Sequence, residues 1–194
     1  METTNKNSLI ENYQESYYSN YGFGGINYAT NIAVQNTLRG LGRYLCSNLD
    51  FNTHLDVGCA MGYLVEYMRI KGKNSCGIDF SKYAIEHAMP IAAPYIWQHD
   101  FSLNPIGNQY DIVTCIEVLE HLKTEDESFA IQNLCDSSRI GIYFSSDENY
   151  DEPTHINIHN RQYWIDRFAD RGFVLDETIN YSEIGWGFFV RRSI

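Results

Sequence analysis

The chain is predicted to adopt an α/β fold with a Rossmann-like, doubly wound sheet of seven strands, mostly parallel, and an antiparallel strand from a C-terminal hairpin. Short apolar runs alternate along the chain with stretches of helical periodicity, which implies βαβ crossovers and parallel strands. The last two apolar runs have no helix between them, so they are expected to pair as an antiparallel hairpin at one edge of the sheet. The length of 194 residues is typical of one domain.

Five apolar runs are predicted to form the parallel strands: residues 54–58, 75–80, 95–100, 110–117 and 139–146. Helices are predicted over residues 31–49, 62–72, 82–89, 124–135 and 161–172, and two further strands within 173–192. Ser81 and Asn160 are predicted to cap the helices that follow them, and Thr124 with Glu127 has the spacing of a capping box. Residues 1–48 are expected to form a lid or helical segment, and residues 49–194 the main domain.

The amino-acid composition limits the kinds of partner that the chain is expected to bind. Asp and Glu number 25 against 14 Lys and Arg, so the formal net charge is −11, which is a poor match for nucleic acid. The five cysteines are scattered without a CxxC pair, which favours reduced thiols and a cytoplasmic protein. No apolar run has the length of a membrane span. We therefore expect a small-molecule acceptor, no membrane or nucleic-acid partner, and a monomer or homodimer.

The stretch DVGCAMG, residues 56–62, follows the first predicted strand and leads into a helix. Ligands of such sheets lie beyond the C-terminal ends of the strands. Gly58 and Gly62 remove side chains from this turn, so a ligand can approach the main chain, and the helix start offers amides to a carboxylate. Asp79 ends the second strand, where an acidic side chain can accept both hydroxyls of a ribose. The site is expected to take a nucleoside that carries a carboxylate.

The loop lacks the GxGxxG pattern of dinucleotide-binding proteins and the GKS or GKT of a phosphate loop. It resembles instead the signature of the class I S-adenosylmethionine-dependent methyltransferases, from which it departs by Ala60 in place of the middle glycine. GIDFS, QHDFSLNP and YDIVTCIEVLEHL extend the resemblance from about residue 50 to the end of the chain. It implies S-adenosylmethionine as cofactor and S-adenosylhomocysteine as product.

The resemblance also implies which residues contact the cofactor. Asp56 and the two glycines would line the methionine side, and Glu117 would lie near the methionine amine or the backbone around it. Asp79 would hold the ribose, with Phe80 beside the adenine. Asp100 would accept from the adenine amino group, with Phe101 covering the ring. The full expected set is Tyr28, Asp56, Gly58, Cys59, Ala60, Gly62, Asp79, Phe80, Asp100, Phe101 and Glu117.

The sulfonium of the cofactor is already activated, so the remaining requirements are alignment and, for an oxygen nucleophile, a base. Histidine suits this role near neutral pH. His155 is the first candidate because its loop carries proline, asparagine and two histidines, and His121 and His159 are the others. These loops could equally be stabilised by histidine and asparagine hydrogen bonds. The other three histidines, His54, His87 and His99, are predicted to be surface or packing residues.

An alternative involves a divalent metal ion. Glu117, Glu120 and His121, joined by His155 or His159, offer oxygen and nitrogen ligands. The arrangement resembles the small-RNA 2′-O-methyltransferases of the Hen type. The acidic charge and the lack of an RNA-binding module oppose that alternative, so no metal is predicted.

The N-terminal tyrosines are candidates for the acceptor side. They surround the glycines of residues 22–25 and are expected to fold over the site or to pack on the sheet. Tyr18, Tyr21 and Arg161 are the predicted substrate-binding residues. The predicted function is methyl transfer to an oxygen of a small soluble acceptor, such as a natural-product, sugar or phosphonate-like intermediate. A cofactor-binding subunit without catalysis is the third possibility, suggested by Ala60.

Overall fold

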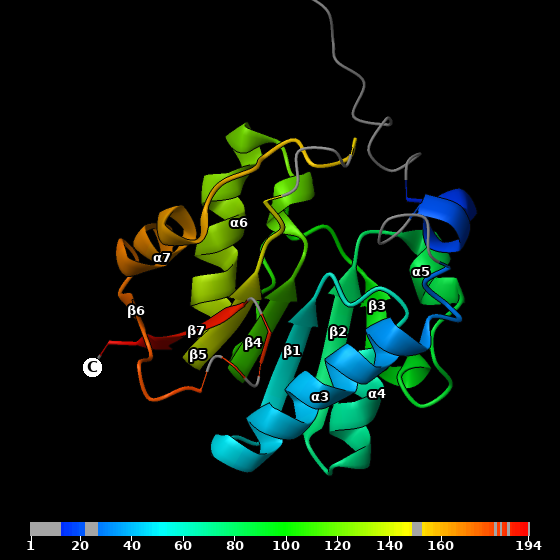
Figure 1. Cartoon of the computed structure of the whole chain (residues 1–194), viewed down its shortest axis with the longest axis horizontal. Coiled ribbons are helices and arrows are strands. Elements are labelled where there is room, and N and C mark those ends of the chain that lie inside the picture. Colours follow the sequence, from blue (N-terminus) through cyan, green and yellow to red (C-terminus); the bar gives the residue numbers. More distant parts are fainter. Residues whose placement is uncertain are drawn as a thin grey trace, which may run out of the picture.

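A computed structural model describes residues 13–21, 27–148, 153–180, 182, 184–185 and 187–193, with the backbone alone at positions 20 and 21. One seven-stranded sheet lies between two layers of helices (Figure 1). The predicted fold class is confirmed.

The strands follow the order β3-β2-β1-β4-β5-β7-β6 across the sheet. Their bounds are β1 Thr53–Val57, β2 Asn74–Asp79, β3 Ile96–Gln98, β4 Tyr110–Ile116, β5 Ser138–Ser145, β6 Phe173–Leu175 and β7 Phe188–Arg192. The first five strands pair in parallel, whereas β7 runs antiparallel to both of its neighbours, β5 and β6. The predicted C-terminal hairpin is therefore confirmed, and β1 and β4 lie at the centre, where the winding reverses.

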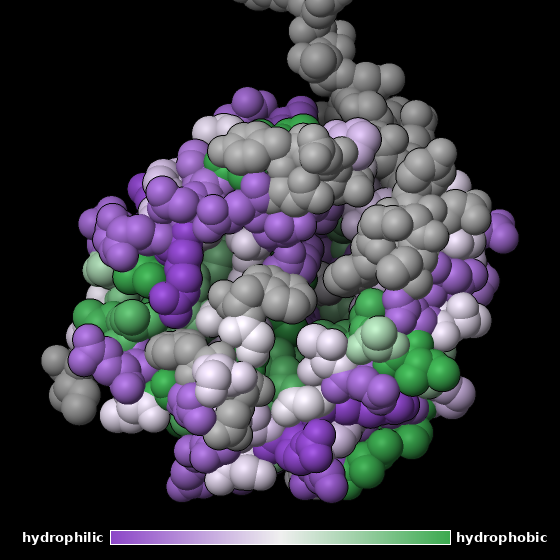
Figure 2. Space-filling view, viewed as in Figure 1, coloured by the Kyte–Doolittle hydropathy of each residue, from purple (hydrophilic) through white to green (hydrophobic). Residues whose placement is uncertain are grey.

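Helices cover both faces of the sheet. Their bounds are α3 Ile32–Asn48, α4 Tyr63–Ile70, α5 Lys82–Glu86, α6 Thr124–Ser137 and α7 Arg161–Ala169, with short helices η1 Tyr17–Tyr21, η2 Ala93–Tyr95 and η3 Leu119–His121. In Figure 1, α3 and α4 cross the front of β1 and β2, and α6 and α7 lie beside β4 and β5. Figure 2 shows many hydrophilic and neutral residues on the front face, with hydrophobic residues at its left side and toward its lower right.

Two apolar clusters hold these layers to the sheet. Trp164 and Phe168 of α7 are almost fully buried with Phe144 of β5, and their rings lie 5.3 and 5.2 Å from it. Leu45 of α3 is likewise buried against the opposite face of the sheet. Each such side chain contributes about 1.5–3 kcal/mol through its burial. The sheet is thus fixed from both faces, which leaves its C-terminal edge as the place for a site.

Two of the three predicted caps are confirmed. The Ser81 side chain accepts from the amide of Ala84 at 3.2 Å, and that of Asn160 from the amide of Tyr163 at 2.9 Å. The capping box at Thr124 is wrong, because Thr124 is the first helical residue and the cap position, Lys123, makes no side-chain bond.

Tertiary contacts explain the missing capping box. The Thr124 hydroxyl lies 3.4 Å from Asn157 Oδ1, and the Glu127 carboxylate accepts from Tyr163 and Arg167 of α7. Several boundaries also differ from prediction: β3 is shorter than 95–100, α5 ends at Glu86 rather than at 89, α6 ends at Ser137 rather than at 135, and α7 ends at Ala169 rather than at 172. Among the described residues, no helix combines the length and apolar character that crossing a bilayer requires.

Candidate active site

The loop of residues 58–62 connects β1 to α4 at the C-terminal edge of the sheet. Gly58 and Gly62 have φ angles of +75° and +81°, in the left-handed region that glycine adopts readily. A Cβ at Gly58 would collide with Val118, and one at Gly62 would lie 2.7 Å from the Cβ of Ala92. Both glycines therefore allow close packing of the loop on its own neighbours, which brings the main chain down onto the strand ends.

Asp79, at the end of β2, is anchored between this loop and the start of α5. Its carboxylate accepts from the amide of Ala60 at 2.8 Å and from the amide of Ser81 at 2.8 Å. Burial raises the pKa of Asp79 to about 6, and these two amides oppose the rise. Each carboxylate oxygen has a second lone pair, so the group can still accept from two hydroxyls. This geometry suits the predicted ribose contact.

Asp56 lies beside Asp79, on β1. It is 5% exposed, and its Oδ1 accepts from the Thr114 hydroxyl at 2.6 Å. Burial raises the pKa of Asp56 to about 7, the Thr114 hydrogen bond opposes this, and the charge of Asp79 adds to it. Two neighbouring carboxyl groups make this a place that favours a cationic ligand group.

The N-terminal tyrosines cover the loop. Tyr18 and Tyr28 are buried in one cluster with Ala60 and Met61, and the Tyr28 amide donates to the Tyr18 carbonyl at 2.7 Å. Burial, followed by the charge of Asp56, raises the pKa of Tyr28. Tyr28 thus lies next to the predicted cofactor site. The side chain of Tyr21 lies outside the described residues, and the lid role of this segment stays a prediction.

The residues predicted for the adenine side follow the ends of β2 and β3, which pair in parallel. Phe80 lies at the end of β2, with the Tyr13 ring 4.9 Å away. Asp100 closes its own turn, accepting from the Ser102 amide at 3.0 Å and from the Ser102 hydroxyl at 2.6 Å. Phe101 is 6% exposed and packs in the hydrophobic core. In this structure its ring is a core side chain rather than an open cover for a ligand, while Phe80 is half-buried.

Two of the predicted catalytic histidines come together. The ring centres of His121 and His155 are 4.7 Å apart. His121 Nδ1 lies 3.2 Å from the Thr154 carbonyl, so Nδ1 carries the proton and Nε2 is left as an acceptor. Burial and then His155 lower the pKa of His121 to about 4, so this imidazole is neutral at neutral pH.

Glu120 completes this cluster. One atom each of Glu120, His121 and His155 lie within 4.8 Å of one another. Glu120 is fully buried, its Oε1 accepts from the Asp147 amide at 3.2 Å, and its Oε2 has no hydrogen-bond partner among the described residues. Burial and then Glu117 raise its pKa. Glu117 itself accepts from the Ser145 hydroxyl at 2.6 Å, at a φ of +54° that is strained for a side-chain residue.

The prediction that grouped His159 with these residues is not supported by its contacts. Its Nε2 lies 3.1 Å from Asn157 Oδ1, and its ring stacks on Tyr163 at 3.7 Å. Arg161 is exposed at the start of α7, with its guanidinium 5.4 Å from the Phe188 ring centre. These ring contacts of His159 and Arg161 are thus with α7 or β7.

Sequence reasoning missed two contributors. Tyr13 lies 4.9 Å from Phe80 and 5.6 Å from His121 by ring centres, so it contacts both halves of the site. Thr114 binds Asp56 directly. A signal for Thr114 existed, because it is the one hydroxyl inside the apolar run DIVTCI of β4.

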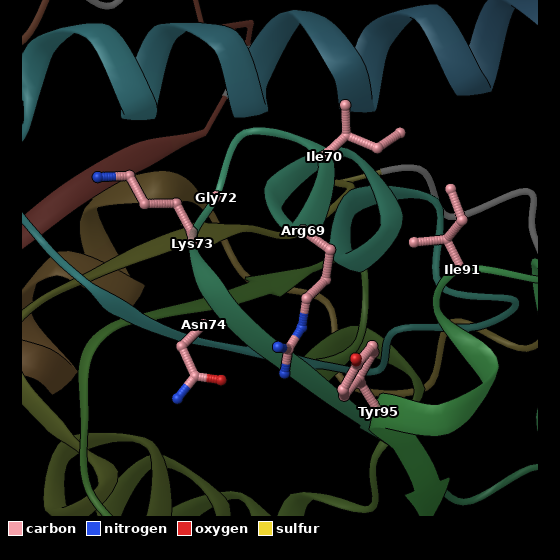
Figure 3. A pocket seen from close by; sticks show the side chains of 7 residues that line it. All are labelled: Arg69, Ile70, Gly72, Lys73, Asn74, Ile91 and Tyr95. Carbon is pink, nitrogen blue, oxygen red and sulfur yellow. The ribbon is translucent and has the colours of Figure 1, made fainter.

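A surface depression of about 430 Å³ lies elsewhere (Figure 3). Among its lining residues, Arg69 stacks its guanidinium 3.5 Å from the Tyr95 ring centre, and Asn74 is the first residue of β2. Asp79 is at the opposite end of the same strand, so this depression is separate from the candidate site.

Comparison with known proteins agrees with this geometry. A family described as a methyltransferase domain, Methyltransf_23, matches residues 34–178. Ubiquinone biosynthesis O-methyltransferases of Paracidovorax citrulli and Photobacterium profundum are 37% and 39% identical over 76 and 75 residues, covering 35% of this chain and 32% of each relative. The match therefore spans about a third of the length of these curated relatives.

Solved structures share the fold. A magnesium protoporphyrin IX methyltransferase from Synechocystis PCC 6803, with bound S-adenosylhomocysteine, has a TM-score of 0.73 at 18% identity and covers 97% of this chain and 100% of that one. CalS10, an amino pentose methyltransferase from Micromonospora echinaspora, has a TM-score of 0.67 at 12% identity, covering 86% and 94%.

The alternating sheet, the glycine turn and the acidic strand end define a class I methyltransferase fold. This chain belongs to the methyltransferase-domain family, since the match covers most of its length. The resemblance seen in the sequence is confirmed, and the solved structures that share this fold include ones with bound S-adenosylhomocysteine and S-adenosylmethionine.

Proposed function

We propose that this chain methylates an oxygen atom of a small acceptor, with the cofactor at the loop of residues 58–62 and the acceptor beside His121 and His155. One observation carries the proposal. The Tyr13 ring contacts Phe80 on one side and His121 on the other, so the expected nucleoside site and the histidine pair are one residue apart. S-adenosylmethionine carries its methyl group on a sulfonium. Because this methyl group is already activated, its transfer mainly requires an aligned nucleophile.

The residues present fit this cofactor. Asp79 is oriented by two backbone amides and retains lone pairs for two ribose hydroxyls. Asp56 offers a buried carboxylate to the ammonium group of the methionine part. Tyr28 lies over both acids and limits the access of water.

His155 acts as the base in this proposal. It lies beside His121, whose neutral ring accepts through Nε2 because the Thr154 carbonyl takes the Nδ1 proton. The neutral ring of His121 places no positive charge beside His155, and His155 takes the proton of the acceptor hydroxyl. The acceptor class is a natural-product, sugar or phosphonate-like hydroxyl compound, and the name of the ubiquinone biosynthesis O-methyltransferase relatives supports transfer to oxygen.

A metal-assisted version of the same reaction is the second candidate, favoured by the cluster around Glu120. Two imidazoles and a buried carboxylate oxygen without a partner can hold a divalent ion. The hydrogen bond from His121 Nδ1 to a carbonyl is the outer contact that orients such a ligand. The ion would bind the acceptor hydroxyl and lower its pKa. No observation favours RNA as the acceptor, and the net charge of −11 opposes it.

The test is a transfer assay with isotopically labelled S-adenosylmethionine and a panel of phenols, sugars and phosphonates. We expect His155→Ala to lower kcat about 100-fold or more while the Kd of S-adenosylhomocysteine stays unchanged. His159→Ala is the matched control and keeps wild-type kcat. Equal losses in both variants contradict the role of His155. Transfer to no compound, with normal cofactor binding, favours the non-catalytic subunit instead.

Chelation separates the two candidates. If His155 acts as a simple base, EDTA leaves kcat unchanged. If the cluster holds a metal ion, EDTA abolishes turnover, a divalent cation restores it, and Glu120→Gln loses the restoration.

A further inference from the structure

A chain of buried polar side chains crosses the centre of the sheet. Ser75 of β2, His54 and Asp56 of β1, and Thr114 of β4 each have at most 5% exposed surface. Ser75 lies opposite His54 in the strand register, and Thr114 lies opposite Asp56. His54 and Asp56 are two residues apart on one strand, so they share a face, and the four side chains form a continuous row.

The hydrogen bonds of this row all have one direction. The Thr114 hydroxyl donates to Asp56 Oδ1 at 2.6 Å. Because its proton is used there, Thr114 Oγ1 accepts from His54 Nε2 at 3.0 Å. His54 Nδ1 is then unprotonated and accepts from the Ser75 hydroxyl at 2.8 Å. Burial lowers the pKa of His54 to about 3, which keeps this ring neutral.

Packing alone does not account for such a row. Central parallel strands are usually continuous runs of aliphatic residues, and buried hydroxyl and imidazole groups cost free energy unless each is paired. Here the pairing is complete within the row, and it ends at Asp56, next to the loop of residues 58–62. Asp56 is the only charged member, so every donor in the row is directed toward its carboxylate.

The groups that face Asp56 come from each element around it: Asp79 of β2, Thr114 and Cys115 of β4, Cys59 of the loop and Tyr28 of the N-terminal segment. No described lysine or arginine forms an ion pair with it. Asp56 is thus a buried carboxylate at the end of a row of three hydrogen-bond donors, and no described cationic side chain pairs with it. Such a carboxylate is suited to bind a cationic group of a ligand.

We propose that Ser75, His54 and Thr114 form a positioning relay that favours the ionised form of Asp56 and orients its carboxylate toward the ammonium group of the bound cofactor. The relay rests on the proposed placement of the cofactor beside Asp56. Each hydrogen bond polarises the next, so the hydroxyl at Thr114 is a stronger donor than an isolated one. None of the three residues touches the reacting atoms, and they act through Asp56.

The experiment measures the Kd of S-adenosylhomocysteine by calorimetry between pH 5.5 and 8.5 in the wild type and in Thr114→Val. Valine keeps the shape and removes the donor to Asp56. We expect the pKa of Asp56 to rise by about one unit, so that the variant binds about tenfold more weakly at pH 6 and less than about twofold more weakly at pH 8.5. Thr114→Ser restores the wild-type profile, and Ile112→Val, a buried change on the same strand, leaves it unchanged.

Two results overturn the relay: an unchanged profile in Thr114→Val, or a loss of affinity that is the same at every pH, which is the signature of a structural role. If Thr114→Val fails to fold, nitrogen-15 NMR of the wild-type histidines decides. His54 is expected as the Nε2–H tautomer without titration from pH 5 to 8, and an Nδ1–H tautomer contradicts the relay. Normal cofactor binding without methyl transfer contradicts the proposed function but does not contradict the relay.

Discussion

Single residues at the strand ends set the shape of the site. Gly58 is required by its positive φ and by Val118, which occupies the place of its missing side chain. Ala60 carries a positive φ of 47° and a Cβ, and its amide is tied to Asp79. The strain at this residue is thus offset by the hydrogen bond that orients the carboxylate.

Gly58→Ala is expected to lower the free energy of unfolding by about 2–4 kcal/mol, because the left-handed backbone and the collision with Val118 both oppose a Cβ. Urea unfolding measures the loss. Gly72→Ala is the matched control: its φ is +80°, but no atom lies within 4 Å of the added carbon. The control is expected to lose only about 1 kcal/mol. Equal losses in both variants contradict the packing explanation.

At the scale of elements, the loop of residues 153–160 is tied to η3. The amides of Ile156 and Asn157 donate to the Glu120 carbonyl at 2.8 and 2.9 Å. The Asn157 side chain donates to Glu127 Oε2 of α6 at 3.0 Å and to the Leu119 carbonyl at 3.3 Å. These contacts place His155 beside His121, although 33 residues of other structure separate them in the chain.

Asn157→Ala is expected to reduce the free energy of unfolding by about 1–3 kcal/mol, because it removes two buried hydrogen bonds. Steady-state kinetics should show kcat lowered about tenfold, since His155 is no longer fixed, with the Kd of S-adenosylhomocysteine unchanged. Gln132→Ala, which removes only the exposed bond to Asp136, is the control and changes neither quantity. A loss of cofactor affinity without a loss of kcat contradicts this role for the loop.

Periodicity and capping residues predicted most of the helices and strands, and tertiary contacts explain the exceptions. The apolar runs predicted all seven strands, and the absence of a helix before β7 predicted its antiparallel direction. The capping box at Thr124 failed because Glu127 is drawn to Tyr163 and Arg167. β3 is shorter than its apolar run because it is an edge strand that pairs on one side only.

For the whole molecule, buried titrating groups make stability depend on pH. The folded pKa values of His54 and His121, about 3 and about 4, lie below the usual value near 6.5. The unfolded chain therefore binds more protons below pH 6.5, and these two groups lower stability as the pH falls toward 4. Asp56 and Asp79 act in the opposite sense, because their raised pKa values, about 7 and about 6, let the folded state bind protons first.

His121→Gln is expected to reduce the slope of unfolding free energy against pH by up to about 1.4 kcal/mol per unit between pH 4.5 and 6. Urea unfolding at a series of pH values measures this slope. His87→Gln is the control, because His87 is exposed and its ring stacks only on Tyr83. An unchanged slope in His121→Gln means that the imidazole titrates normally in the folded chain.

The sequence by itself determined the sheet class, the glycine turn of residues 58–62 and the acidic strand ends, because these depend on local patterns of glycine, period and charge. It also supplied His121 and His155 as candidates. Only the tertiary structure decided that these two meet at Glu120 while His159 packs on α7, that Phe101 belongs to the core, and that Thr114 connects His54 to Asp56. Those facts depend on strand register and on contacts between distant segments, and a linear pattern carries neither.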